Sequence, residues 1–180
     1  MHERRFHGDI DRLRSPERIS LLEIERVISM SLDGISPATV LDIGTGSGVF
    51  AEAFAGKGLT VSGIDANPDM LSVLPRYVPQ GIFRQAVAEE IPFPDGSFDL
   101  VFFGHVLHET DDPLQALKEA KRVAVQRVVI LEWPYRVEQH GPPIEERLTP
   151  ETIEDVIRKA GFRSIEMTLL QHMILYILNN

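Results

Sequence analysis

The sequence predicts an α/β domain whose sheet is mostly parallel and covered by helices on both faces. Short apolar runs alternate with helical stretches along most of the 180-residue chain, and strand, helix, strand in series builds βαβ units. Four of the first five runs are nearly continuous in apolar residues, as strands buried on both faces are. The last two runs lie only two residues apart, which allows only an antiparallel hairpin.

These patterns place the elements along the chain. The strands are predicted at 39–43, 60–64, 82–85, 98–103, 128–132, 165–170 and 173–178. The helices between them are predicted at 48–55, 68–74, 113–123 and 150–160. Three helices begin with a capping residue and a proline, at Asn67-Pro68, Asp112-Pro113 and Thr149-Pro150. The last helix should stop at Gly161, because glycine can adopt the left-handed conformation at a helix C-terminus.

Two further segments flank this core. A single helix is predicted at 15–32, because apolar residues recur there mostly at helical spacing behind Ser15 and a proline, and it should end near Gly34. The irregular segment 133–148 is rich in proline and glycine, so we expect a loop over the strand ends.

Composition and charge exclude several classes of function. The chain has no cysteine, which excludes disulfides, thiolate zinc sites and cysteine nucleophiles. Its formal charge of −9 disfavours a nucleic-acid partner. The six histidines are scattered without metal-ligand spacing, so no metal site is predicted. The N-terminus lacks the apolar core of a signal peptide, and no apolar run approaches the ~20 residues that span a bilayer, so a cytoplasmic protein is expected.

A glycine-rich loop joins the first predicted strand to a helix, in the sequence Asp42-Ile43-Gly44-Thr45-Gly46-Ser47-Gly48. Its glycines permit positive φ and expose bare backbone, while the helix N-terminus supplies free N–H donors. Such a loop suits a small polar ligand. By itself it does not separate a dinucleotide from other ligands.

Three residues narrow the choice of ligand. Asp42 places a carboxylate where the pyrophosphate of a dinucleotide would approach, which favours a cationic amine or sulfonium instead. Val49 stands where the dinucleotide fingerprint has glycine or alanine. Asp65 ends the second strand, where a carboxylate can accept hydrogen bonds from both hydroxyls of a ribose. The residues therefore indicate an adenosine ligand with a cationic tail.

At this point the sequence resembles the class I S-adenosylmethionine-dependent methyltransferases, in the group that includes the quinone-biosynthesis C-methyltransferases. The likeness runs from about Val40 to Glu132. It lies in three blocks, Val-Leu-Asp-Ile-Gly-Thr-Gly-Ser-Gly, Gly-Ile-Asp-Ala-Asn-Pro-Asp-Met-Leu and Ala-Glu-Glu-Ile-Pro-Phe-Pro-Asp-Gly-Ser-Phe-Asp-Leu-Val. The resemblance implies a Rossmann-like, doubly wound seven-stranded sheet with an antiparallel last strand. It also implies S-adenosyl-L-methionine as cofactor and S-adenosyl-L-homocysteine as product.

The resemblance assigns roles to particular residues. The methionine part would be held by Asp42 and the loop of Gly44, Thr45, Gly46 and Gly48. The adenosine part would be held at Asp65, Ala66, Ala88 and Glu89. Gly104 and His105 would close over the sulfonium side.

Two departures from the family pattern stand out. Relatives commonly have an aspartate that binds the adenine amino group where this chain has Val87, so adenine would depend on backbone contacts, Glu89 or water. Relatives also carry a Lys-Pro-Gly-Gly-type turn before the fifth strand. Here residues 122–127 run straight on, so that connection is expected to be short.

His105 and His108, beyond the fourth strand, are the candidate catalytic residues. Methyl transfer from a sulfonium is an in-line displacement, so a general base is needed only where the acceptor must lose a proton. The alternative is that His105 offers mainly its backbone and that His108 packs or caps locally. Trp133 and Tyr135 are candidates for walls around an aromatic or apolar acceptor.

Taken together, residues 1–180 are predicted to form one methyltransferase domain. A lid-like helix at 1–35 that includes Phe6 and His7 would precede a cofactor-binding core at 36–132 and a loop, helix and C-terminal β-hairpin at 133–180. The expected acceptor is a small molecule, and either the lid or a second subunit of a homodimer would complete its site. Two alternatives stay open: a non-catalytic protein that binds S-adenosylmethionine, and an NAD(P)-dependent oxidoreductase.

Overall fold

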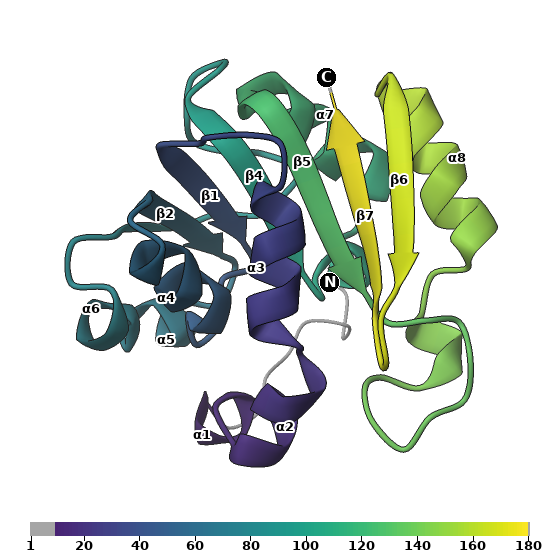
Figure 1. The fold of residues 1–180 in the computed structure, drawn as a ribbon, viewed down its shortest axis with the longest axis horizontal. Helices are drawn as coiled ribbons and strands as arrows, with labels where there is room; N and C mark the ends of the chain where they lie inside the picture. The colour runs from purple at the N-terminus through teal and green to yellow at the C-terminus, as the bar shows by residue number, and fades with distance from the viewer. Residues whose placement is uncertain (1–9, 180) are drawn as a thin grey trace.

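The computed structural model describes residues 10–179, which form one seven-stranded sheet flanked by helices (Figure 1). The strands are β1 (Thr39–Ile43), β2 (Thr60–Asp65), β3 (Ile82–Gln85), β4 (Phe98–Gly104), β5 (Ala124–Glu132), β6 (Ser164–Leu169) and β7 (Ile174–Asn179). Each strand matches a run that the apolar pattern predicts, so these predictions are confirmed.

The sheet has the order β3-β2-β1-β4-β5-β7-β6. β7 runs antiparallel to both of its neighbours, β5 and β6, whereas the pairs among β1 to β5 are parallel. The chain therefore winds outward from β1 to β3, returns to the other side of β1 at β4 and winds outward again. This doubly wound, Rossmann-like arrangement confirms the predicted fold class, including the antiparallel last strand.

The helical segments after β1 are α4 (Val49–Gly56), α5 (Pro68–Leu71), α6 (Leu74–Tyr77), η1 (Leu107–Glu109), α7 (Pro113–Val123), η2 (Ile144–Glu146) and α8 (Pro150–Ala160). They lie close to where the sequence predicts them, except the short helices η1 and η2, which it did not predict. Asn67, Asp112 and Thr149 each cap a helix by accepting a hydrogen bond from a backbone N–H, as predicted. The predicted helix at 68–74 is instead two short helices.

The connection before the fifth strand is as short as the sequence indicates. α7 ends at Val123 and β5 begins at Ala124, four residues earlier than the apolar run at 128–132 predicts. Val125 is exposed in this first part of β5, so the strand has no continuous apolar signal there. The helix passes directly into the strand.

The predicted single helix at 15–32 is wrong. The segment forms α2 (Pro16–Leu21) and α3 (Ile24–Leu32), preceded by α1 (Ile10–Leu13). The break lies at Glu23, whose φ of 45° is left-handed and cannot continue an α-helix. The break turns α1 and α2 away from the face of the sheet, so that they lie beyond the carboxyl ends of the parallel strands (Figure 1). Phe6 and His7, the other parts of the predicted lid, lie outside the described residues.

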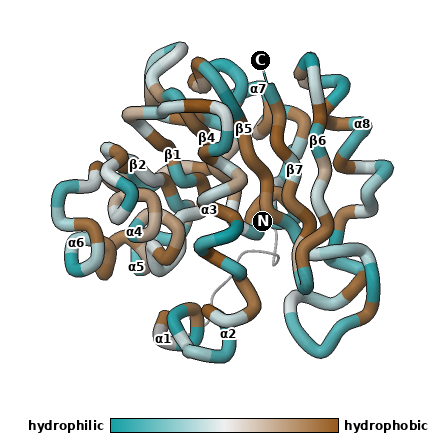
Figure 2. Tube along the Cα trace, viewed as in Figure 1, coloured by the Kyte–Doolittle hydropathy of each residue, from teal (hydrophilic) through white to brown (hydrophobic). Residues whose placement is uncertain are grey.

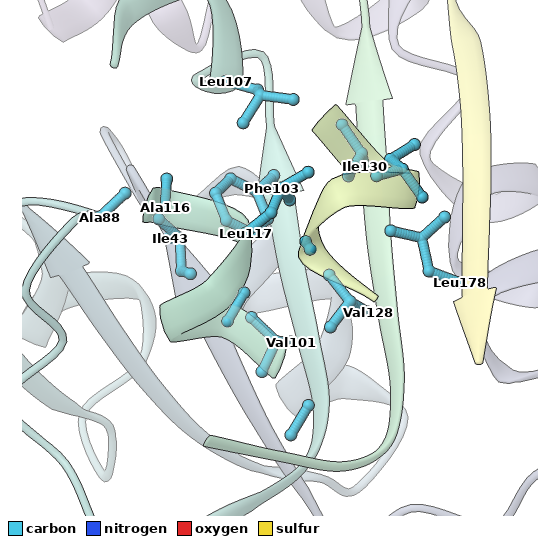
Figure 3. Close-up of a cluster of buried hydrophobic side chains, with 14 of the residues drawn as sticks. Ile43, Ala88, Val101, Phe103, Leu107, Ala116, Leu117, Val128, Ile130 and Leu178 are labelled. Carbon is cyan, nitrogen blue, oxygen red and sulfur yellow. The ribbon is translucent and has the colours of Figure 1, made fainter. Parts of the chain in front are cut away.

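Two apolar layers hold the helices on the sheet. α7 and α8 pack on one face, where Leu117, Phe103 and Ile130 belong to one buried cluster (Figure 3). α3 and α4 pack on the other face, where Ile28 and Phe54 belong to a second cluster. Apolar residues accordingly concentrate along the central strands (Figure 2). The sheet is thus rigidly covered on both faces, and its carboxyl edge is left to form a site.

Arg127 links α3 to the sheet through hydrogen bonds. It is buried in β5, and its Nη1 donates to the carbonyl oxygens of Ser31 at 3.0 Å and Asp33 at 2.8 Å, at the end of α3. Arg127→Leu should lower the free energy of unfolding by about 1–3 kcal/mol, because these carbonyl groups lose a charged donor. The midpoint of unfolding in urea measures this change in stability. Arg158→Leu, at an exposed arginine with a 3.7 Å ion pair, should change it little.

Candidate cofactor and acceptor site

A cavity of about 630 Å³ opens at the carboxyl ends of β1 and β4, where the winding of the sheet reverses. Ligands of open α/β sheets bind at this kind of switch point. The walls come from the loops after β1, β2, β4 and β5, from the segment after β3 and from α1 and α2. The structure therefore brings the predicted cofactor residues and the two candidate histidines to one cavity, except Gly48, which is not part of its lining.

The glycine-rich loop follows β1 and depends on its glycines for steric reasons. Gly44, Gly46 and Gly48 all have positive φ, at 63°, 51° and 78°. A Cβ on Gly44 would lie 2.4 Å from Val106 Cγ2, and one on Gly48 would lie 2.5 Å from Leu74 Cδ2. Side chains there would push the β4 loop and α6 away, so the loop combines a conformational and a packing need for glycine.

Asp42 lies buried at the base of this loop. Its Oδ2 accepts a hydrogen bond of 2.8 Å from Thr45 Oγ1. The pKa of Asp42 is raised to about 7, mainly by burial; the charge of Asp65 acts in the same direction, and the hydrogen bonds from Thr45 and the Ala51 backbone act against it. The carboxylate form is thus poorly stabilised by the protein alone, and a ligand cation would stabilise it.

Asp65 ends β2 at the other side of the loop. Its Oδ2 accepts from Gly46 N and its Oδ1 from Asn67 N, both at 2.8 Å. These hydrogen bonds fix the carboxylate in the wall of the cavity, next to Ala66. Its place at the end of the second strand is the one that suits a ribose.

Ala88 and Glu89 line the cavity together with Val87. Glu89 has a structural task that the sequence did not reveal: its Oε1 accepts from the backbone N–H groups of Asp111, at 2.7 Å, and Asp112, at 3.1 Å. Glu89 therefore fixes the start of α7 while it borders the predicted adenine edge.

His105 closes the end of β4 and has a left-handed backbone, with φ of 61°. Its N–H donates to Leu131 O at 2.9 Å, and its ring packs against Trp133 with centroids 5.1 Å apart. Its Nε2 lies 3.0 Å from Met173 Sδ. Burial lowers the pKa of His105 well below its usual value, and the charges of Arg18 and His108 act in the same direction. The ring is therefore a neutral, packed wall of the cavity.

His108, in η1, forms a buried pair with Glu132 at the end of β5. His108 Nδ1 lies 2.9 Å from Glu132 Oε2 and 3.1 Å from Oε1, and the His108 backbone N–H donates to Oε1 at 3.2 Å. The N–H of Trp133 donates to Oε2 at 3.2 Å. Burial lowers the pKa of His108, but the charge and hydrogen bond of Glu132 outweigh it, with smaller contributions from Glu109 and Glu146, so the net pKa is raised.

The sequence reasoning missed the role of Glu132, which it treated only as the end of a strand. One signal was available: an acidic residue directly after the apolar run of a buried central strand is placed at the functional edge of the sheet. Of the two predicted acceptor walls, Trp133 is buried and lines the cavity, whereas Tyr135 is 46% exposed and lies away from the described lining.

The described residues carry neither a metal centre nor a membrane span. Between residues 10 and 179, no group of three or more histidine and acidic side chains is arranged to hold a metal ion. Within the same range, no helix is both long and apolar enough to cross a bilayer.

The fold and the cavity define a class of protein: a doubly wound α/β domain with a cavity at the switch point of its sheet, a glycine-rich loop after β1 and an acidic residue after β2. The family described as "Methyltransferase domain" matches residues 41–130, half of the chain. The chain belongs to this family.

Curated relatives match mainly the same half. An uncharacterized methyltransferase of Mycobacterium tuberculosis is 38% identical over 96 residues, which are 52% of this chain and 39% of the relative. The demethylmenaquinone methyltransferase of Chlorobaculum tepidum is 36% identical over 93 residues, which are 51% of this chain and 38% of the relative. The match thus spans well under two thirds of either relative.

Solved structures match nearly the whole fold. A SAM-dependent methyltransferase from Aquifex aeolicus superposes with a TM-score of 0.84 at 26% identity, covering 94% of this chain and 96% of that one. The Pyrococcus horikoshii protein PH0226 superposes with a TM-score of 0.75 at 21% identity, covering 96% and 94%, which shows the fold alone.

Proposed function

We propose that the protein is an S-adenosylmethionine-dependent methyltransferase acting on a small-molecule acceptor. The observation that carries the proposal is the buried Asp42 carboxylate beside the glycine-rich loop. The ionised carboxylate attracts the ammonium and sulfonium charges of this cofactor and repels a pyrophosphate, and its raised pKa indicates that the protein itself supplies no cation to pair with it. The family match supports the same activity.

The residues present fit the cofactor. Asp42 and the backbone of Gly44 to Gly48 would hold the amino-acid tail, and Asp65 the ribose hydroxyls. Ala66, Ala88 and Glu89 would border the adenine, with Val87 leaving adenine to backbone contacts. The cofactor supplies an electrophilic methyl group. The protein's contribution is to exclude water and to align the acceptor with that group.

Two histidines border the reacting end in different ways. His105 is held by Met173 and Trp133 and is proposed to shape the cavity rather than to accept a proton. His108 is proposed to accept the proton of an acceptor that reacts through O–H or N–H, with Glu132 as the residue that positions it. This pair favours an enzyme over a protein that only binds the cofactor.

The acceptor side of the cavity has an apolar part. Leu22, directly after α2, and Trp133, after β5, both line the cavity. The Chlorobaculum relative is named for methylation of a demethylmenaquinone, an apolar ring compound. We therefore propose an acceptor with an apolar or aromatic body.

Two experiments test the function. Calorimetric titration should show binding of S-adenosylhomocysteine and none of NADH, and the reverse result would establish a dinucleotide site. Incubation of the protein with methyl-labelled S-adenosylmethionine and a panel of aromatic hydroxyl, amine and quinol compounds should then move label to an acceptor. Label that stays on the cofactor with all acceptors, including a cell extract, would favour a binding role.

Asp42 also predicts a pH dependence of cofactor binding. Because its pKa is about 7, the Asp42 carboxyl of the ligand-free protein is largely protonated below pH 7. The ammonium of S-adenosylhomocysteine favours the ionised form of this carboxyl. Binding should therefore release a proton. The affinity for S-adenosylhomocysteine should rise as the pH increases from 6 to 8, and below the pKa it should rise by up to about tenfold per pH unit. Calorimetry in buffers of different ionisation enthalpy measures the proton release. Asp42→Asn should remove the dependence, and a flat profile in the wild type would contradict the assignment.

A further inference from the structure

A single residue separates α2 from α3. Leu22 still has right-handed helical angles, with φ of −78° and ψ of −13°, and α3 begins at Ile24. Between them Glu23 is left-handed, with φ of 45° and ψ of 42°. Neither glycine nor proline occurs at positions 17–32, and glutamate is a good helix former. The local sequence therefore favours a continuous helix, and the left-handed residue carries backbone strain.

Contacts near the start of the segment hold it in the bent position. Arg14, between α1 and α2, donates from Nε to the carbonyl oxygen of Ser47 in the glycine-rich loop at 3.0 Å. It also forms an ion pair with Glu52 of α4 at 2.8 Å, and its Cζ lies 3.3 Å from the ring centroid of Tyr77 in α6. Straightening at Glu23 would change the direction of the whole segment and break these contacts.

The segment also supplies a wall of the cavity. Four of its residues belong to the lining: Arg12, Leu13, Arg18 and Leu22. Leu22 is buried in this position, and Leu13 Cδ1 would lie 3.6 Å from a Cβ placed on Gly46. Figure 1 shows α1 and α2 beyond the carboxyl ends of the parallel strands. The bent segment therefore covers the glycine-rich loop, and turning it away would expose the cavity to water.

The side chain of Glu23 adds two hydrogen bonds to the bent position. Its Oε2 accepts from the N–H of Gln171 at 2.8 Å, and its Oε1 accepts from Arg26 Nη1 at 2.9 Å. Both bonds lie at the surface, where water competes for them. The local helix preference thus opposes contacts that exist only in the bent form, as in an element with two conformations.

We propose that residues 10–22 form a lid that opens when the chain straightens at Glu23 and that closes when the cofactor binds. A cofactor on the glycine-rich loop contacts the lid only in the bent conformation, so binding favours that conformation. Closure then excludes water from the transferred methyl group. The inference rests on the proposed function, because the ligand that favours closure is the proposed cofactor.

Two substitutions at Glu23 isolate the effect of its backbone conformation. Glu23→Gly and Glu23→Ala both remove the bonds to Gln171 and Arg26, but glycine accepts the left-handed conformation whereas alanine favours a helix. Calorimetry should therefore show that the glycine variant binds S-adenosylhomocysteine about tenfold or more tightly than the alanine variant. Gly161→Ala is the matched control, because Gly161 is left-handed too, at the end of α8 outside the described lining. It should lower stability and leave the affinity for S-adenosylhomocysteine unchanged.

The position of the lid can be measured directly, because the chain has no cysteine. Cysteines introduced at the exposed positions Glu17 of α2 and Ser72 after α5 would carry the only spin labels. Electron–electron resonance of each variant at Glu23 should show two populations of label distance. The alanine variant should be enriched in the population that S-adenosylhomocysteine removes.

Three results would overturn the proposal. The first is equal affinity of the glycine and alanine variants for S-adenosylhomocysteine. The second is one label distance that is the same in both variants, with and without ligand. The third is an equal loss of affinity in Gly161→Ala, which would show that the glycine-to-alanine difference acts through stability alone. A wild type that binds no S-adenosylhomocysteine would contradict the proposed function instead, and the label distances of the ligand-free variants would still test the hinge.

Discussion

Replacing His108 by glutamine is expected to slow methyl transfer by about 10²- to 10⁴-fold, the range typical of a positioned general base. The imidazole lies buried at the cavity, and its Nδ1 is held 2.9 Å from Glu132, which orients the other ring nitrogen. Glutamine can hydrogen-bond but cannot accept a proton at neutral pH. The measurement is label transfer from methyl-labelled S-adenosylmethionine to the acceptor identified in the panel.

The pH profile separates a catalytic role of this pair from a structural one. A base acts only when unprotonated, so the rate should rise with pH through a pKa above the ordinary value of 6.5. Because Glu132 raises the pKa of His108, Glu132→Gln should move this rise to lower pH and also reduce the maximal rate. Both variants should bind S-adenosylhomocysteine as the wild type does. Variants that lose cofactor affinity and activity together, with an unshifted profile, would show that the pair only supports the fold.

Replacing Asp65 by alanine is expected to weaken binding of both S-adenosylhomocysteine and 5′-methylthioadenosine by about 100-fold or more, since charged hydrogen bonds of roughly 1.5–3 kcal/mol each are lost. Two causes act together. The ribose loses its acceptor, and Gly46 and Asn67 lose the carboxylate that fixes their N–H groups at 2.8 Å. Calorimetry of the two ligands measures the effect.

Asp42→Asn serves as the control for Asp65→Ala, because the two substitutions should affect the two ligands differently. Asp42→Asn should weaken the binding of S-adenosylhomocysteine, which has an amino-acid tail, more than the binding of 5′-methylthioadenosine, which has none. Asp65→Ala should weaken the binding of both ligands alike. Asp69→Asn, at an exposed position in α5 close to the site, should change the binding of neither ligand. If Asp65→Ala affected only the ligand with the tail, the ribose assignment would be wrong.

The amino-acid sequence by itself determined the strands, most of the helices and the glycine-rich loop with Asp42 and Asp65, which we propose to hold the cofactor. Buried parallel strands are short continuous apolar runs, and capping pairs such as Asp112-Pro113 act within one turn, so both are readable locally. The glycine-rich loop with Asp42 is a contiguous segment, and Asp65 lies directly after its strand. Their chemistry follows from residue type and neighbours along the chain.

Only the tertiary structure brought together the residues of the proposed acceptor end. His108 and Glu132 meet from positions 24 residues apart, and His105 meets Met173 across 68 residues, because the order of the strands brings the ends of β4, β5 and β7 together. The left-handed turn at Glu23 broke a helix that apolar spacing predicts to be continuous, and that break carries Arg18 to the cavity. Contacts between distant segments depend on packing, and periodicity along the chain holds no information about them.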